Sequence, residues 1–453
     1  MNIQEAKESI ASAVKAYISR DQAGRPSVPL HSQRPILVLG APGLGKTAIM
    51  SQIATEMGIG FVSYTMTHHT RQSAIGLPMI EKAIYNGEEK EITRYTMSEI
   101  VSSVYDAIEQ QGHKNGILFI DEVNCVSETL APAMLDLLQN KKFGPHLIPD
   151  GWVLVAAGNP PEYNASAREM DIATLDRLRV IEVEPDTEVW LSYARGAGIQ
   201  GSVIYYLQVK PQNLLRIERT PSGPVFVTPR GWEDLSLMMD SFESMGLDTD
   251  RTLVSQYIRE PSVAEEFFRY YGFYKKYSQD HDIEAVLDGR STDNDAIAHA
   301  DAEEKLSIIS MIVGSLTSDA EKVLGLMMFS DSLKEKDPKG YLIRISDSDP
   351  MRRIAAGHAL IRLSSSGVED SKIEEDLKQA RSRFDSRLEN AMTFMRSAFG
   401  NGQETSSLLS ALLGSYSVVM ASEPDSPLYR LNDELFSEGR DRRIAEMLGG
   451  GTS

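Results

Sequence analysis

A single glycine-rich stretch constrains this chain more than any other. Residues 40–47 read Gly-Ala-Pro-Gly-Leu-Gly-Lys-Thr, which fits the pattern G-x-x-x-x-G-K-[ST]. The apolar run 35–39 before it is typical of a buried parallel strand, and residues 48–54 after it show helical spacing. A strand, a glycine turn and a helix N-terminus in this order direct several backbone N–H groups at one point. The stretch therefore predicts a polyphosphate-binding loop in an α/β domain.

The two polar residues that close this loop have distinct expected roles. Lys46 would place a positive charge on the β- and γ-phosphates, and Thr47 would offer a hydroxyl to Mg²⁺. A coincidental glycine turn would lack the flanking strand and helix. We expect ATP to be contacted by Gly40, Ala41, Pro42, Gly43, Leu44, Gly45, Lys46, Thr47 and Ala48.

Two carboxylate residues follow a second predicted buried strand. Residues 116–120 are a glycine and four apolar residues, and Asp121 and Glu122 follow directly. Ligands of open α/β sheets bind at the carboxyl ends of the strands. We therefore expect Asp121 to organise Mg²⁺ and Glu122 to deprotonate the attacking water. The alternative is a solvated strand end that caps the next helix.

A polar residue also follows the next apolar strand, 152–158. Asn159 should reach the same sheet edge as Asp121, where its amide could bind the γ-phosphate or the lytic water; the alternative is an asparagine that caps a turn. With 60–67 and 180–184, the chain has five candidate strands interleaved with helices, which is the α/β pattern.

Charge, cysteine usage and hydropathy limit the function classes. The net charge of −19 argues against a protein devoted to duplex nucleic acid, although it leaves room for a local basic groove. One cysteine, Cys125, fits a reducing compartment, and its expected state is a buried structural thiol. The N-terminus lacks a signal-peptide pattern and no apolar run is long enough to span a bilayer. We expect a soluble, cytoplasmic protein without a membrane association.

Composition and periodicity divide the chain into five segments. A lead-in helix and loop (1–34) precede the nucleotide-binding core (35–185), a helical segment (186–280), an acid-rich linker (281–303) and an all-α C-terminal region (304–453). Within the core, Asn86-Gly87 between two β-like runs predicts a hairpin over 79–96.

Taken in order, these motifs resemble the MoxR family of AAA+ ATPases. The resemblance covers roughly residues 30–240 and includes Ile120-Asp-Glu-Val-Asn124, Gly158-Asn-Pro160, Leu175-Asp-Arg177 and Thr228-Pro-Arg230. It implies a five-stranded parallel αβα core with a small helical lid, and ATP bound between subunits of a hexameric homo-oligomer. It also implies chaperone-like remodelling of a partner protein, in some members one with a von Willebrand factor A domain.

The resemblance also implies roles for particular residues. Asn159 is similar to sensor 1, Arg177 to the arginine finger and Arg230 to sensor 2. The sequence departs from the family where Leu178 replaces a usual phenylalanine and Arg179 offers a second candidate finger. The hairpin expected before sensor 1, at 141–151, is also short and rich in proline, and residues 290–453 match no family pattern.

Two other groups of residues fit structural roles better than binding sites. His68-His69 lacks a nearby third ligand, so a polar loop is favoured over a metal site. The tyrosines between 270 and 277 fit helix packing better than a nucleic-acid platform. The leading function is an Mg²⁺-ATP-driven remodelling ATPase acting on protein; the rivals are a nucleic-acid motor and an ATP-binding switch or scaffold that seldom turns ATP over.

Overall fold

The chain divides into two compact units. The computed structural model describes residues 1–66, 76–164, 166–221, 223–279, 283–290, 300–348, 352–365 and 370–434. Unit 1 comprises Met1–Val189 with Thr228–Arg230, and unit 2 comprises Trp190–Val227 with Gly231–Ser453. The predicted core thus lies in unit 1, whereas most of the lid shares unit 2 with the C-terminal region.

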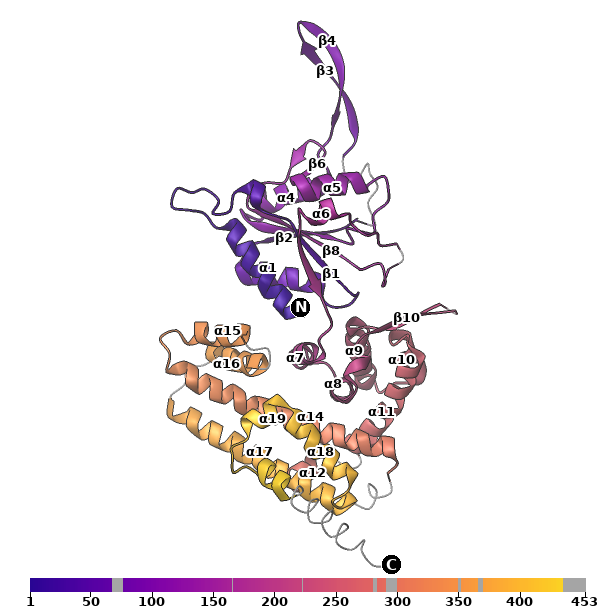
Figure 1. Ribbon diagram of the computed structural model, residues 1–453, viewed down its shortest axis with the longest axis vertical. Helices are drawn as coiled ribbons and strands as arrows, with labels where there is room; N and C mark the ends of the chain where they lie inside the picture. The colour runs from indigo at the N-terminus through magenta and orange to yellow at the C-terminus, as the bar shows by residue number, and fades with distance from the viewer. Residues whose placement is uncertain are drawn as a thin grey trace, which may run out of the picture. The chain divides into compact units, whose positions relative to one another are not determined.

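Unit 1 is built on a parallel sheet (Figure 1). Its strands follow the order β2-β5-β8-β1-β9, and each adjacent pair is parallel. The strands are β1 (Ile36–Gly40), β2 (Gly60–Thr65), β5 (Gly116–Asp121), β8 (Trp152–Gly158) and β9 (Arg179–Val183). Every residue of β8 is buried, as expected of a strand covered on both faces. The five predicted strands are therefore confirmed, and their carboxyl ends share one edge.

Helices cover both faces of this sheet. Side chains alternate along a strand, so Ile36 and Val38 lie in one apolar core while Leu37 lies in the other. The first core includes α1 (Ile3–Ile18) and α2 (Lys46–Met57), and the second includes α4 (Glu99–Glu109) and α5 (Ala131–Asn140). The αβα fold predicted from the sequence is confirmed. Shorter elements of unit 1 are η1 (Leu30–Ser32), β6 (Lys142–Phe143), β7 (His146–Leu147) and α6 (Ile172–Leu175).

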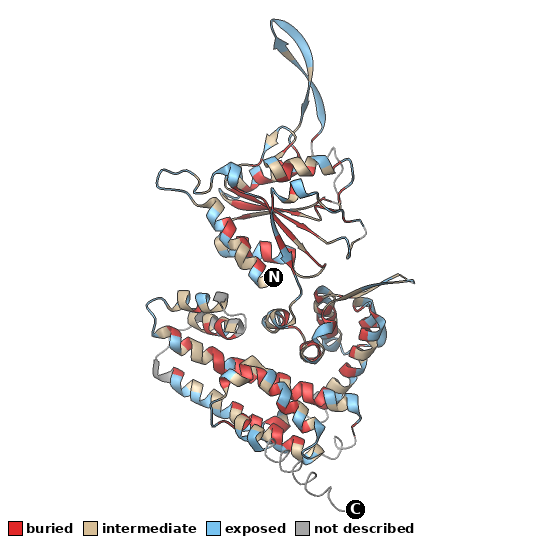
Figure 2. Ribbon diagram, in the orientation of Figure 1, coloured by how far each residue is buried: buried red, intermediate tan, exposed pale blue. Residues whose placement is uncertain are grey.

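A long hairpin projects from unit 1 (Figure 1). Strands β3 (Pro78–Tyr85) and β4 (Glu88–Tyr95) pair antiparallel, and Asn86 and Gly87 have φ values of 52° and 83°. Positive φ at both central residues is the requirement of a type I′ turn. Figure 2 shows both strands as largely exposed, in contrast to the buried central sheet. The predicted hairpin is confirmed.

Unit 2 is largely helical. Its elements are α7 (Thr187–Ala197), α8 (Gly201–Val209), η3 (Pro211–Asn213), β10 (Arg216–Thr220), β11 (Gly223–Val227), α9 (Pro229–Ser244), α10 (Arg251–Tyr257), α11 (Pro261–Gln279), α12 (Ile283–Leu287), α14 (Ala302–Leu333), α15 (Pro338–Ser348), α16 (Arg353–Ser365), α17 (Asp370–Phe399), α18 (Gln403–Gly414) and α19 (Tyr416–Ala421). Elements α7 and α9 begin in residues of unit 1. The antiparallel hairpin β10–β11 was not expected, because the lid was predicted from helical periodicity alone.

Aromatic packing organises the lid part of unit 2. Tyr206 and Trp232 lie in one core, and Phe267, Tyr270 and Tyr271 of α11 join them. The centroid of the Phe267 ring is 5.0 Å from that of Trp232 and 5.3 Å from that of Tyr206. The expectation that these tyrosines serve helix packing is confirmed.

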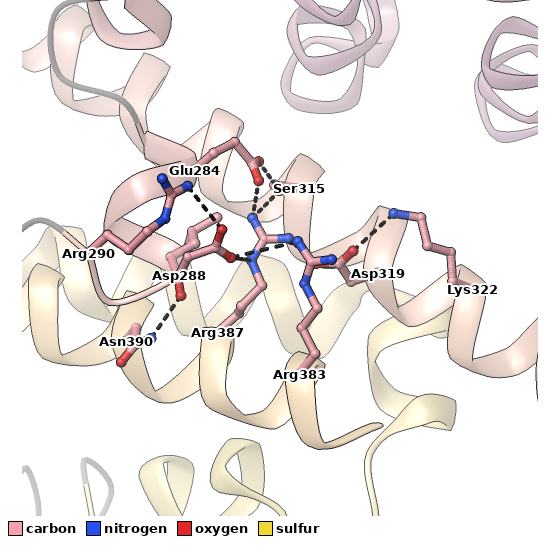
Figure 3. A network of polar contacts seen from close by, with 10 residues as sticks. Glu284, Asp288, Arg290, Ser315, Asp319, Lys322, Arg383, Arg387 and Asn390 are labelled. Carbon is pink, nitrogen blue, oxygen red and sulfur yellow. Dashed lines mark hydrogen bonds and ion pairs between the residues drawn. The ribbon is translucent and has the colours of Figure 1, made fainter. Parts of the chain in front are cut away.

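A buried arginine ties three helices of unit 2 together (Figure 3). The side chain of Arg387, on α17, is 3% exposed. It pairs with Asp319 of α14 and Glu284 of α12, and its Nε lies 3.3 Å from Asp288 Oδ1. Ser315 Oγ accepts a further hydrogen bond of 3.1 Å from its guanidinium. One buried cation therefore contacts three carboxylates at a helix junction, and Lys322, Arg290 and Arg383 pair with two of them.

The predicted linker needs a correction at residues 283–287. These form α12, whose Ile283, Val286 and Leu287 are buried in the same core as α14 and α17. The acid-rich composition of the segment outweighed these three apolar residues, whose helical spacing lets them pack together.

Residues 291–299 of that segment and His68-His69 lie outside the described residues. Among the helices that the structure describes, none combines the length and apolar character needed to cross a membrane.

Candidate functional site

The glycine loop joins β1 to α2 at the carboxyl edge of the sheet. Gly43 and Gly45 have φ values of 81° and 87°, which side-chain-bearing residues rarely adopt. A Cβ on Gly43 would also make tight contacts, at 3.1 Å from Thr228 Cβ and 3.3 Å from Arg230 Cβ. The glycines thus turn the chain into the N-terminus of α2 and let the 228–230 segment approach.

Lys46 lies at the centre of the site and is 8% exposed. Its Nζ donates to Gly40 O at 2.9 Å, to Ala41 O at 2.9 Å and to Asn159 Oδ1 at 3.0 Å. The pKa of Lys46 is lowered to about 8, mainly by burial and also by nearby Arg230, whereas Asp121 and Glu122 act to raise it. The amine is a partly desolvated charge that an anion would stabilise.

Thr47 and Asp121 are joined across the site. Thr47 Oγ1 donates to Asp121 Oδ2 at 2.8 Å, so two oxygens of the kind that Mg²⁺ prefers lie together. The other oxygen, Asp121 Oδ1, accepts from the backbone N–H of Glu122 at 2.9 Å. Glu122 itself has a φ of 55°, an uncommon backbone state for a residue with a side chain. A strained residue directly after the carboxylate is typical of a functional site.

Asn159 meets this group from the neighbouring strand. It follows β8 directly, and its side chain contacts Lys46 as described above. Its backbone carbonyl accepts a hydrogen bond of 2.8 Å from Asn124 Nδ2. The parallel strands place Asn159 at the same sheet edge as Asp121, as the sequence predicts. Asn124 was part of the sequence motif but received no role, because its contact with Asn159 depends on the strand order.

The two remaining predicted residues lie in different places. Arg230 is at the glycine loop, since its Cβ lies close to Gly43 and its positive charge lowers the pKa of Lys46. Arg177 is exposed and bonds to Gln139 of α5. It precedes β9, whose first residue Arg179 pairs with Ile36, while Gly40 pairs with Val183 at the far end. Arg177 is thus at the amino edge of the sheet, and the length of β9, about 13 Å, separates it from the end that adjoins the glycine loop.

Residues 36–171 match the model of the ATPase family associated with various cellular activities (AAA). Over these residues the chain is similar to the ATPase domain of the AAA family. The match contains the glycine loop, Asp121, Glu122 and Asn159, and it ends before Arg177 and Arg230. The AAA domain accounts for the nucleotide-binding edge and leaves unit 2 unassigned.

Individual relatives are distant. The chaperone protein ClpB of Bacteroides thetaiotaomicron is 26% identical over 258 residues, which is 55% of this chain. The chain spans only 28% of the length of that chaperone. A solved structure of a Cytophaga hutchinsonii protein described as an ATPase is 19% identical, with a TM-score of 0.27, and the match covers 44% of this chain and 57% of that one. These likenesses leave the activity of the whole chain to be inferred from its own residues.

Proposed function

We propose that this chain is an Mg²⁺-dependent ATP hydrolase that uses turnover to remodel another protein. The observation that carries the proposal is the convergence of Lys46, Thr47, Asp121 and Asn159 beside the N-terminus of α2. Backbone N–H groups and a buried amine suit the phosphates, and the carboxylate suits a divalent cation. The family match over the same residues supports a nucleotide as the ligand.

Each side chain of the site would have a separate role in the transfer of the γ-phosphoryl group to water. Thr47 and Asp121 would hold Mg²⁺, which neutralises charge on the phosphates when it is bound. Glu122 would take a proton from the attacking water, and Asn159 would orient that water or the γ-phosphate. Lys46 and Arg230 would stabilise negative charge as the terminal P–O bond breaks. The water oxygen forms its new bond to the γ-phosphorus as that bond breaks, the water gives one proton to Glu122, and ADP and inorganic phosphate leave.

We further propose a ring in which Arg177 serves the neighbouring subunit. Its location at the amino edge separates it from the glycine loop of its own chain. An exposed guanidinium there could reach ATP only across a subunit contact, as an arginine finger acts in trans. This supports a homo-oligomer of the hexameric MoxR type.

The projecting hairpin supports a protein as the substrate. Ile80 and Ile84 of β3 are each 76% exposed and share one face, and Met79 on the other face is 57% exposed. Apolar side chains on an exposed element mark a protein contact surface. The net charge of −19 argues against nucleic acid, and the similarity to a chaperone fits a remodelling role. A protein with a von Willebrand factor A domain is the partner class we propose within the MoxR reading.

The function is tested first by ATP turnover. The chain should release phosphate from ATP with Mg²⁺ and stop when EDTA removes the metal, and Lys46→Ala should be inactive because the loop loses its cation. Binding of ATP without turnover at any protein concentration would instead indicate a switch or scaffold. Stimulation by single-stranded DNA in a salt-sensitive manner would indicate a nucleic-acid motor.

The substrate is tested with a trapped state. Glu122→Gln loaded with ATP should retain a partner protein that can be identified by mass spectrometry. Replacing Ile80 and Ile84 by serine should release that partner. Lys82→Ser is the matched control, because Lys82 lies on the same face between the two isoleucines. Equal release by both variants would exclude the apolar face as the contact.

A further inference from the structure

Asn124 joins two strands beyond the point where their regular pairing ends. The ladder between β5 and β8 stops at the pair Ile120 and Ala156. Two more hydrogen bonds continue it: Val123 N–H to Ala157 O at 2.9 Å, and Asn124 Nδ2 to Asn159 O at 2.8 Å. The segment that carries Glu122 is therefore fastened to the segment that carries Asn159.

The site around Asn124 is built closely. Asn124 is 7% exposed, and a Cβ added to Gly158 would lie 2.5 Å from its Oδ1. The missing side chain at Gly158 is what allows the amide to pack against the end of β8. The backbone carbonyl of Asn124 accepts from Arg168 N–H at 2.9 Å, which also fixes the following loop. Asn124 is held from both its side chain and its backbone.

The contact reaches the reacting groups through Asn159. Asn124 binds the backbone of Asn159, so it leaves the side chain of Asn159 available to Lys46. A fixed backbone with a responsive side chain is the arrangement that a phosphate sensor requires, because the side chain must release Lys46 from Oδ1 and turn its Nδ2 donor to a phosphate oxygen without moving the strand.

We infer that Asn124 is a positioning residue that holds the backbone of Asn159 in register with Glu122 for hydrolysis. The inference rests on the proposed ATPase function for its kinetic consequence. Its structural part, the restraint of residue 159 by residue 124, stands independently of that function.

The test uses Asn124→Leu in the full chain, because leucine keeps the branch at Cγ and has no donor and no charge. Loss of the bond leaves Asn159 O without its protein partner. We expect kcat for ATP to fall about 10- to 100-fold, as for other positioning contacts, with KM changed less than about threefold. Asn164→Leu is the matched control, since Asn164 bonds to Cys125 Sγ at 3.2 Å and not to Asn159.

Two further measurements separate positioning from a general structural role. Combining Asn124→Leu with Asn159→Ala should be no slower than Asn159→Ala alone, because residues that act through one another are not additive. Hydrogen exchange at the Asn159 and Tyr163 amides should speed up about tenfold in Asn124→Leu and not in Asn164→Leu. If Asn124→Leu does not fold, Asn124→Asp keeps the shape, removes the donor and carries the same three measurements.

Each result decides the inference. Multiplicative loss in the double variant, or unchanged exchange at residues 159 and 163, would overturn it. Absence of turnover in the unmodified chain would refute the proposed function alone, and the exchange comparison would still decide the role of Asn124.

Discussion

Lys46 and Asn159 lie 113 residues apart in the chain and are joined by a hydrogen bond of 3.0 Å between Lys46 Nζ and Asn159 Oδ1. Together with two carbonyls of the glycine loop, the asparagine holds the amine before any phosphate is bound. A nucleotide would exchange these neutral acceptors for charged oxygens, which form stronger bonds to an ammonium group. The energetics of binding therefore depend on the charge of Lys46.

The first prediction concerns pH. With its pKa near 8, folded Lys46 loses its proton well below the value of about 10.4 for an unfolded lysine. Affinity for a non-hydrolysable ATP analogue should stay constant below pH 8 and weaken by up to about tenfold per pH unit above it, because only the charged amine attracts phosphate. ATP itself is fully ionised there, its last phosphate pKa being about 6. Fluorescence titrations from pH 6.5 to 9.5 would measure this.

The matched control is Lys46→Arg, which remains charged across that range. Its affinity should be lower but independent of pH. Between pH 8 and about 10.4 the unfolded state binds more protons at residue 46, so this group makes the nucleotide-free protein more stable as pH rises. Parallel affinity profiles for both proteins would contradict the assignment of the titration to Lys46.

The second prediction separates binding from hydrolysis. Glu122→Gln should bind ATP like the unmodified chain and hydrolyse it about 10²–10⁴-fold more slowly, because an amide cannot accept the proton of water. Single-turnover measurements with radiolabelled ATP would give both quantities. Glu128→Gln is the control, since Glu128 is exposed and pairs with Arg168. A wild-type rate in Glu122→Gln would assign the base to another group.

The third prediction places the finger between subunits. Arg177→Ala should bind ATP and lose about 10³–10⁵ in rate, and turnover per subunit should rise with protein concentration as rings form. Mixing Arg177→Ala with Lys46→Ala should restore part of the activity, because some interfaces then combine an intact loop with an intact finger. Co-assembly without recovery would show that Arg177 acts within its own subunit or that Arg179 is the finger. Repeating the mixture with Arg179→Ala separates these cases.

The fourth prediction concerns the stability of unit 2. Arg387→Met should destabilise it by about 3–5 kcal/mol, because buried carboxylates such as Asp319 would lose their cation. Arg383→Met is the control: Arg383 is largely exposed and lies 3.7 Å from Asp288. Urea unfolding can be followed by Trp190 and Trp232 in a Trp152→Phe background. Equal effects of the two substitutions would mean that the network contributes little.

The nucleotide-binding edge could be predicted because its information is local. The glycine loop, the acid pair and Asn159 each follow a short apolar strand, and parallel strands bring their carboxyl ends together whatever their order. The contact of Arg230 with the loop depends on a return of the chain from residue 189 to 228, so only the family resemblance suggested it. Asn124 was overlooked because its role depends on β5 lying beside β8.

Unit 2 shows where sequence patterns fail. The composition of the acid-rich segment predicts a linker at residues 283–287, because its acidic residues outnumber Ile283, Val286 and Leu287. These three residues are nevertheless buried in a helix. The sequence pattern around Arg387 is that of a charged residue on a polar helix, yet its side chain is buried against carboxylates from two other helices. Long-range compensation of charge leaves no periodic pattern in the sequence.

The strands β3 and β4 form a two-stranded sheet in the described structure, so both outer edges carry backbone groups without a ladder partner. Open edges promote uncontrolled aggregation as readily as they accept a legitimate partner. The ion pairs Lys82–Glu89 and Arg94–Glu81 distribute charge along these strands, in the way that natural sheets protect their edges. The solubility of the protein is therefore set, in part, by the same sixteen-residue pair of strands that we propose for partner binding.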